Sequence, residues 1–287
     1  MKLPFFLASR FVAADDLDGT VPVVRRLNAR TPESPGLHVT LDLLGEYVED
    51  RAVATAALGH YETLVRRIAA DGLDSNISIK LSMLGQKIDE DFALANLRRL
   101  LALAREHDIF VRLDMEGSDI TQSTLDLFED VYPDFPDHVG VVLQAYLART
   151  ARDVERMCAL KARVRLCKGA YQEPPEIAYQ TMDDIRARYT EYMRELIRYA
   201  RYPGIATHDD TLIEATKQFT ASEGIGSDAF EFQMLYGIRA GAQRDLAREG
   251  YNVRVYVPYG TDWLPYYGRR LREIKTLGFL VRNVFRR

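Results

Sequence analysis

GVVLQAYLARTARDVERMCALKARVRLCKGAY, residues 140–171, holds two short apolar runs with a helical pattern between them. The runs, Gly140–Tyr146 and Val164–Lys168, are rich in Val and Leu, as is typical of β-strands covered on both faces. Between them, Asp153–Leu160 has apolar residues at helical spacing, which indicates an amphipathic helix. Two such strands joined by a helix predict a βαβ unit, in which the strands run parallel.

The same alternation continues on both sides of this unit, from residue 37 onward. Six further strands are predicted at His38–Leu44, Ile77–Met83, Phe110–Met115, Ile205–His208, Phe230–Leu235 and Val253–Val257. Further helices are predicted at Tyr47–Ala70, Phe92–Ala104, Thr121–Phe128, Met182–Tyr199, Thr211–Phe219, Ile238–Ala247 and Tyr267–Leu280.

Eight strands in strict alternation with helices predict an α/β fold, a (β/α)8 TIM-type barrel formed by residues 37–287. A doubly wound open sheet is the competing architecture, but it would normally carry a glycine-rich turn after its first strand. The segment Leu43–Tyr47 is not such a turn. We expect residues 1–36, with a short helix near Pro22–Ala29, to form an N-terminal helical arm rather than a separate domain.

The composition is that of an ordinary globular protein, 47% apolar and 28% charged, with a net charge of −4. No long block of like charge occurs, so nucleic acid is a poor candidate partner. The two cysteines, Cys158 and Cys167, show no C-x-x-C spacing and suit a reducing compartment. No apolar stretch approaches the roughly 20 residues of a membrane span. We therefore expect a soluble, cytoplasmic protein.

Charged and polar residues stand late in the predicted strands, where the active site of a β/α barrel forms. They are Lys80, Asp114, Gln144, Arg165, Lys168, His208 and Glu231. Because burying a charge is costly unless it is paired or used, so many together predict a polar pocket in the barrel mouth. Lys80 alone could equally pair with Asp114.

The predicted pocket has a cationic balance. Lys80, Arg165 and Lys168 are joined by Arg269 and Arg270 from the last helix, a set that suits an anionic cofactor and an anionic substrate. A metal site is disfavoured, because the chain has only five His residues and His208 alone stands at a strand end.

Seven motifs along the chain together resemble the proline dehydrogenase family. They are Ser78–Ser82, Arg112–Glu116, Gln144–Tyr146, Arg165–Tyr171, Ala206–His208, Phe230–Gln233 and Arg269-Arg270, in the family's order and over roughly residues 37 to 285. The resemblance implies a distorted barrel that binds FAD across the strand ends. The length is similar to that of the monofunctional bacterial members.

The resemblance also implies roles for individual residues. Arg165 would lie beside the flavin N5, and Asp114 would orient the cationic cluster. The cofactor would be held by Met115, Gln144, Arg165, Lys168, Gly169, Ala170, Thr207 and His208. The substrate would be bound by Lys80, Arg269, Arg270, Tyr256, Leu166 and Glu273, with Arg269 and Arg270 clamping its carboxylate, Tyr256 and Leu166 walling its ring and Glu273 bracing the arginine pair.

The implied activity is FAD-dependent oxidation of L-proline to 1-pyrroline-5-carboxylate, by hydride transfer from C5 to the flavin N5. This would be the first step of proline catabolism to glutamate, with electrons passed to a quinone. Implied partners are a separate pyrroline-5-carboxylate dehydrogenase and, by peripheral contact, the inner membrane. Departures from the family pattern are Cys167, Tyr236 and Asp209, the last following His208 where Asn is expected.

Two other functions stay open at this point. A Schiff-base lyase of the class I aldolase type would use the same barrel, with Lys80 or Lys168 as the nucleophilic amine. A barrel that binds an amino acid without catalysis would lack a reactive flavin.

Overall fold

Eight parallel strands close into a barrel in the computed structural model, which describes residues 9–32 and 34–268. The strands are β3 (His38–Leu43), β4 (Ser75–Ile79), β5 (Val111–Leu113), β6 (Val139–Gln144), β7 (Arg163–Cys167), β8 (Gly204–Ala206), β9 (Glu231–Leu235) and β10 (Asn252–Tyr259). They pair in chain order, and β10 pairs with β3 to complete the closure. The predicted (β/α)8 barrel is confirmed, and the open sheet is excluded.

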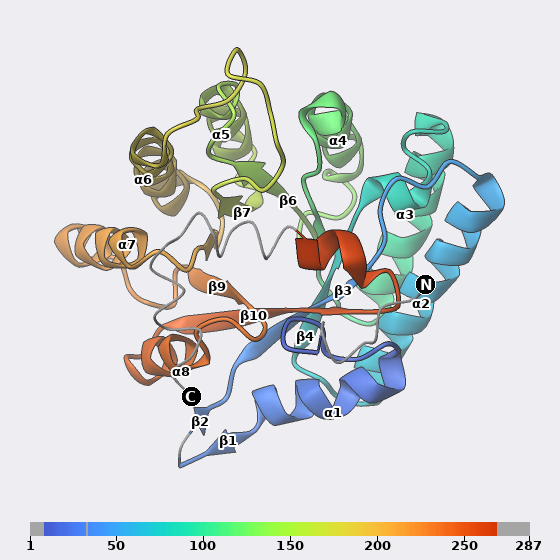
Figure 1. The fold of residues 1–287 in the computed structure, drawn as a ribbon, viewed down its shortest axis with the longest axis horizontal. Helices are drawn as coiled ribbons and strands as arrows, with labels where there is room; N and C mark the ends of the chain where they lie inside the picture. The colour runs from blue at the N-terminus through green and yellow to red at the C-terminus, as the bar shows by residue number, and fades with distance from the viewer. Residues whose placement is uncertain (1–8, 33, 269–287) are drawn as a thin grey trace.

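Helices surround the barrel on its outside (Figure 1). They are α2 (Arg51–Ala70), α3 (Glu90–Glu106), α4 (Ser118–Val131), α5 (Thr150–Ala159), α6 (Met182–Tyr199), α7 (Asp210–Glu223) and α8 (Ala240–Arg248). Residues 263–268 are also helical. Their apolar faces pack on the outward side chains of the strands, such as Leu41, Ile77 and Leu166, to form the main core.

The inside of the barrel is polar. Side chains alternate along each strand, so the residues between the outward apolar ones point into the lumen. The inward set includes Thr40, Asp42, Asn76, Ser78, Arg112, Asp114, Arg165, Glu231, Gln233, Arg254 and Tyr256, most of them buried. Barrels of this kind are usually filled by branched apolar residues, so this lumen departs from the common pattern.

The N-terminal segment contacts the C-terminal end of β10. Ala13 N donates to Pro258 O and Gly260 N donates to Ala14 O, both at 2.9–3.0 Å. Helix α1 (Leu17–Asn28) and the hairpin of β1 (Arg30–Thr31) and β2 (Ser34–Pro35) come next. The division of the chain at residue 36 stays a prediction. Helix α1 is packed on the barrel, since its Val21 and Val24 belong to the main core.

Several predicted boundaries differ from the structure, and three of the differences have a clear local cause. The run Ile77–Met83 does not stay extended, because a 3₁₀ turn forms at Leu81–Leu84 and ends at Gly85 with φ +97°. Helix α2 begins at Arg51 rather than Tyr47, capped by Asp50, which accepts from Ala52 N and Val53 N. Helix α1 begins at Leu17 rather than Pro22, because Asp16 caps it by accepting from Gly19 N at 2.8 Å. The predicted helix Tyr267–Leu280 lies largely outside the described residues.

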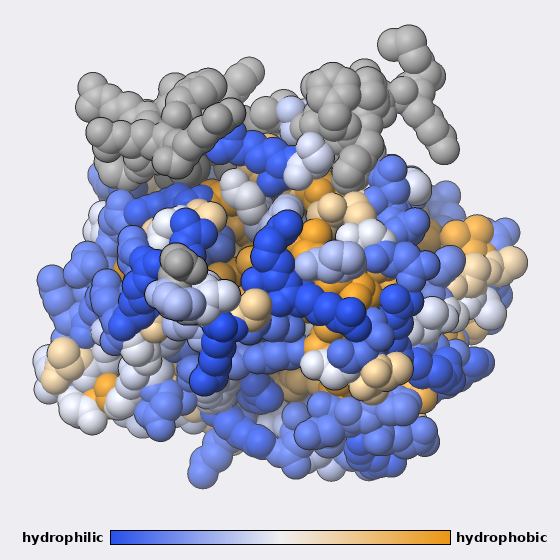
Figure 2. Space-filling model, turned by 90° about the horizontal axis from the view of Figure 1, so that it is seen from below, coloured by the Kyte–Doolittle hydropathy of each residue, from blue (hydrophilic) through white to orange (hydrophobic). Residues whose placement is uncertain are grey.

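In the described part of the chain, no helix is long and apolar enough to cross a membrane. Figure 2 shows one side of the molecule, on which hydrophilic residues predominate and apolar residues appear in small patches.

Candidate active site

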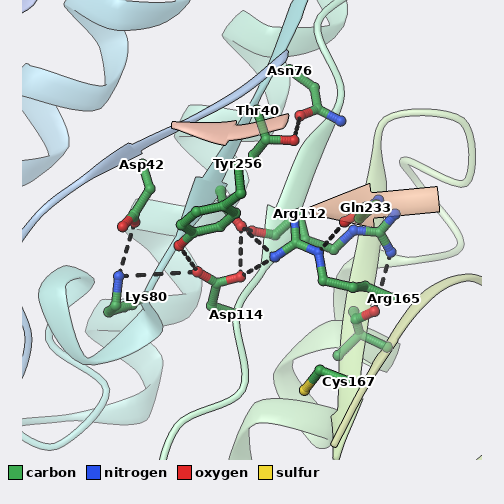
Figure 3. A network of polar contacts seen from close by, with 12 residues as sticks. Thr40, Asp42, Asn76, Lys80, Arg112, Asp114, Arg165, Cys167, Gln233 and Tyr256 are labelled. Atoms are coloured by element: carbon green, nitrogen blue, oxygen red, sulfur yellow. Dashed lines mark hydrogen bonds and ion pairs between the residues drawn. The ribbon is translucent and has the colours of Figure 1, made fainter. Parts of the chain in front are cut away.

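Seven polar side chains meet inside the barrel near the C-terminal ends of its strands (Figure 3). We call this set the Asp114 network: Asp42 from β3, Ser78 and Lys80 from β4 and its end, Asp114 from the end of β5, Arg165 from β7, Gln233 from β9 and Tyr256 from β10. Six different strands thus contribute to one site, as expected where the βα loops gather.

Asp114 is the centre of this network. Its Oδ1 accepts from Ser78 Oγ at 2.6 Å and from Arg165 Nη1 at 2.7 Å. Its Oδ2 accepts from the Tyr256 hydroxyl at 2.7 Å. Both oxygens are therefore occupied, and the carboxylate fixes the directions of a guanidinium and a phenol at once. Burial and the Asp114 charge raise the pKa of Tyr256, so this phenol keeps its proton and remains a donor.

Arg165 is held by its neighbours and still has a donor to offer. Its Nε donates to Gln233 Oε1 at 2.5 Å, and its guanidinium carbon lies 5.1 Å from the centre of the Tyr256 ring. Its Nη2 is buried and has no hydrogen-bond partner among the described residues. Since a buried donor left unpaired costs about 1–3 kcal/mol, this atom marks the place where a ligand could accept a hydrogen bond.

Lys80 pairs mainly with Asp42, a residue that the sequence analysis did not single out. The Lys80 Nζ lies 2.8 Å from Asp42 Oδ1 and 4.0 Å from Asp114 Oδ2. Burial opposes the charged ammonium, but Asp42 and then Asp114 outweigh it and raise the pKa of Lys80. Each of the two cations of the network thus has a carboxylate partner, although burial raises the pKa of Asp42 against the influence of Lys80. The predicted cationic balance also counted Lys168, Arg269 and Arg270, which are not part of this network, and it stays a prediction.

A buried ion pair between Glu231 and Arg254 lies beside the Asp114 network and is linked to it through Gln233. Gln233 Nε2 donates to Glu231 Oε1 at 2.6 Å, and Arg254 Nε donates to both Glu231 oxygens at 2.9 and 3.0 Å. Although burial alone would raise it, the pKa of Glu231 is lowered to about 2 by the Arg254 guanidinium. Gln233 therefore links a buried ion pair to Arg165 and fixes its position.

The residues expected to hold a cofactor lie in or just beyond β5, β6, β7 and β8. Lys168 Nζ donates to Asp209 Oδ2 at 3.0 Å, and Arg186 Nε donates to the same oxygen at 2.8 Å. His208 Nε2 accepts from Leu235 N at 2.9 Å, so a proton of its neutral ring is on Nδ1. Among the others, Met115, Gln144 and Thr207 are buried and Ala170 is exposed.

Gly169 is required by the backbone at the end of β7. Its φ is +118°, and a Cβ there would lie 2.2 Å from the Cδ1 of Tyr146. A larger residue would need both a strained backbone and a displaced ring. Glycine at this position therefore lets the Tyr146 ring pack directly against the main chain at the end of β7.

One predicted substrate residue, Leu166, is not brought to this network, and three others cannot be placed relative to it. Leu166 is fully buried in the main core, and strand alternation places it on the opposite face of β7 from Arg165. Arg269, Arg270 and Glu273 lie outside the described residues. Four residues that hydrogen-bond to the predicted site residues were not predicted to do so: Asp42, Ser78, Gln233 and Asp209. The signal for Asp42 was a charge in an otherwise apolar strand, the argument already applied to Lys80.

The arrangement suits a flavin better than a metal. The unpaired buried donor of Arg165 and the Lys168 ammonium near the end of the same strand fit an anionic cofactor. Within residues 9–32 and 34–268, no group of three or more His, Cys, Asp or Glu side chains could hold a metal ion.

Comparison with known proteins gives one consistent result. Residues 26–277 match the family described as proline dehydrogenase. The chain is 41% identical to proline dehydrogenase 2 of Bacillus subtilis over 266 residues, 93% of this chain and 86% of that one. It is 40% identical to the proline dehydrogenase of Deinococcus radiodurans over 285 residues, 98% of this chain and 90% of that one.

A solved structure agrees with these sequences. Proline utilization A of Bdellovibrio bacteriovorus, inactivated by N-propargylglycine, matches with a TM-score of 0.87 and 25% identity. The match covers 98% of this chain and 34% of that protein, so the chain spans about a third of it. The resemblance predicted from the strand-end motifs is confirmed: this chain belongs to the proline dehydrogenase family.

Proposed function

We propose that this chain oxidises L-proline to 1-pyrroline-5-carboxylate, with FAD as its bound cofactor and a quinone as the electron acceptor. Family membership implies a flavin and proline as substrate. The observation that carries the proposal is the Asp114 network, which gathers a lysine, an arginine and a tyrosine at one end of the barrel.

Each side chain of the network has a distinct part in this proposal. Lys80 binds the proline carboxylate together with Arg269 and Arg270, with Glu273 bracing that pair. Asp114 holds Arg165 and Tyr256 in fixed directions, so that the phenol ring can border the substrate ring and the free Nη2 can donate to the cofactor. Met115, Gln144, Lys168, Gly169, Ala170, Thr207 and His208 complete the cofactor site. Leu166 is left out, because it faces the core.

The flavin, when bound, accepts the hydride that leaves C5 of proline. The protein supplies orientation and electrostatics, since a carboxylate gripped at one end of a small ring fixes the position of the atom at the other end. The positive charge of Arg165 stabilises negative charge that develops nearby, and it needs no rearrangement because Gln233 and Asp114 already hold it.

The contacts of the two lysines argue against the Schiff-base alternative. A nucleophilic amine must lose its proton, and such lysines normally lie in apolar pockets or beside other cations. Lys80 instead pairs with Asp42, which raises its pKa, and Lys168 pairs with Asp209 at 3.0 Å.

The test is to add L-proline to the purified protein without oxygen and to follow the visible absorbance of its flavin. Bleaching by L-proline but not by D-proline supports the proposal. A colourless protein that borohydride traps with a carbonyl substrate would establish the lyase instead. Extraction of the cofactor and separation from FMN identifies it as FAD or refutes that assignment.

We also propose a cytoplasmic location with peripheral contact to the inner membrane, where a quinone is found, and a separate pyrroline-5-carboxylate dehydrogenase that consumes the product. Proline-dependent reduction of a soluble quinone, with and without lipid vesicles, tests the acceptor and the membrane contact. An enzyme that reduces dyes but no quinone would refute the acceptor.

A further inference from the structure

We propose that Asp42 is a positioning residue for proline oxidation, which keeps Lys80 charged and aimed at the substrate carboxylate. The inference rests on the proposed function, because it takes Lys80 as a ligand of that carboxylate. It assigns a role in the reaction to a residue outside the strand-end motifs by which the family was recognised.

The geometry makes Asp42 the main partner of Lys80. Asp42 is 1% exposed and Lys80 is 6% exposed, and their 2.8 Å contact lies inside the barrel. Asp114 is 4.0 Å from the same ammonium, and its two oxygens already accept from Ser78, Arg165 and Tyr256. In the part of the chain that the structure describes, Asp42 is thus the carboxylate within hydrogen-bond distance of Lys80 Nζ. An ammonium has three donors, so the pair leaves Lys80 able to bind a substrate as well.

The charge of Lys80 depends on this contact because the amine is buried. Burial lowers the pKa of Lys80, and Asp42 is the largest influence that raises it. The other titratable groups that act on Lys80 are Asp114 and Glu116, both beyond β5, and Tyr61 on α2. Tyr256 on β10 and Arg165 on β7 contact Asp114 on its other sides. Tyr61 and Tyr256 keep their protons because burial raises the pKa of both. Asp114 also raises the pKa of Lys80, but it lies 4.0 Å away and is shared with Arg165, so it is the weaker of the two counterions.

Asp42→Asn keeps the shape of the side chain and removes its charge. Without the carboxylate, burial lowers the pKa of Lys80, so the ammonium is lost at a lower pH than in the parent. The KM for L-proline should rise about 10- to 100-fold, the range of one charged hydrogen bond. The rise should grow from pH 7 to pH 9, since Lys80 loses its proton as pH increases. The kcat should change much less, because Asp42 does not touch the reacting ring.

A double-mutant cycle with Lys80→Met separates this role from a merely structural one. If Asp42 acts through Lys80, then Asp42→Asn adds no further increase in KM when Lys80 is already Met. The matched control is Thr40→Val, two residues earlier on β3, where Thr40 contacts Asn76 and not Lys80. Thr40→Val should leave KM and its pH dependence at the parent values. Flavin content and thermal unfolding are measured for every variant.

Each outcome decides a different claim. An unchanged KM in Lys80→Met overturns the assignment of Lys80 and with it part of the proposed function. If Lys80→Met raises KM, but Asp42→Asn then raises KM by the same factor with Met at position 80 as with Lys, only the role of Asp42 is overturned. If Asp42→Asn does not accumulate as folded protein, Asp42→Glu gives the test, because the longer side chain displaces Lys80 while it preserves the charge. KM should then rise without added pH dependence, and an unchanged KM overturns the inference.

Discussion

Replacing Asp114 by Asn tests the centre of the network most directly. The carboxylate accepts three hydrogen bonds, from Ser78, Arg165 and Tyr256, at 2.6–2.7 Å. Asn keeps one oxygen, which can face Ser78 and Arg165, but its amide nitrogen then meets the Tyr256 hydroxyl and lies on the side of Lys80. A buried ion pair broken on one side costs about 3–5 kcal/mol, and the oxygen that remains recovers part of this. We therefore expect the free energy of unfolding to fall by about 3 kcal/mol.

Asp114→Asn should lower both the thermal stability of the protein and its activity on L-proline. At roughly 2–3 °C per kcal/mol for a chain of this size, the Tm should fall by about 5–10 °C in a calorimetric scan. The kcat/KM for L-proline should fall about 100-fold, because the guanidinium and the phenol lose the group that orients both. Ser78→Ala is the control: it removes one neutral hydrogen bond and should cost about 1 kcal/mol. If Asp114→Asn unfolds at the parent temperature and oxidises proline normally, Asp114 does not organise the site.

Three further substitutions test other parts of the structure. Gly169→Ala should weaken flavin retention on gel filtration, because its φ is +118° and the new Cβ would lie 2.2 Å from the Tyr146 ring; full retention at an unchanged Tm would contradict this. Glu231 has a pKa lowered to about 2 by Arg254, so its contribution to stability is complete above its ordinary value of 4.5 and is lost as pH falls toward 2. Glu231→Gln should therefore flatten the fall in urea stability between pH 5 and 3, whereas a curve of unchanged slope would refute this. Arg270→Met should raise KM for proline strongly while the flavin stays bound, and loss of flavin would refute its assignment to the substrate.

Periodicity was enough to predict the barrel, but it could not place every boundary. Helix α6 was predicted with its observed limits, Met182–Tyr199, and the structure shows its start capped by Thr181, which accepts from Asp184 N. The run Ile77–Met83 is apolar throughout, and such a run does not distinguish a strand from a tight turn. Gly85, whose left-handed conformation ends the turn, is the signal that the prediction did not use.

Sequence motifs were enough to predict some residues of the Asp114 network, whereas others could be placed only from the pairing of neighbouring strands. Lys80, Asp114, Arg165 and Tyr256 were chosen as strand-end residues, and the structure brings them together. Asp42 could not be placed beside Lys80 from the sequence, because this requires the pairing of Asp42 with Ser78 across β3 and β4. The same alternation explains the position of Leu166, which directly follows an inward residue and must therefore face outward.

The charge balance of the network has a consequence for binding. Lys80 and Arg165 are each matched by a carboxylate, so the network carries little net charge of its own. Without a ligand, these buried charges destabilise the protein less than unpaired charges would, because each has a partner of opposite sign. The network has no excess positive charge to neutralise an added carboxylate, although Lys80 still has donors with which to bind and orient one. An anionic substrate therefore needs cations from outside the network, and Arg269 and Arg270 are the residues that the family resemblance assigns to that task. On this reasoning the barrel interior orients the substrate, and the arginine pair supplies the charge that makes its binding favourable.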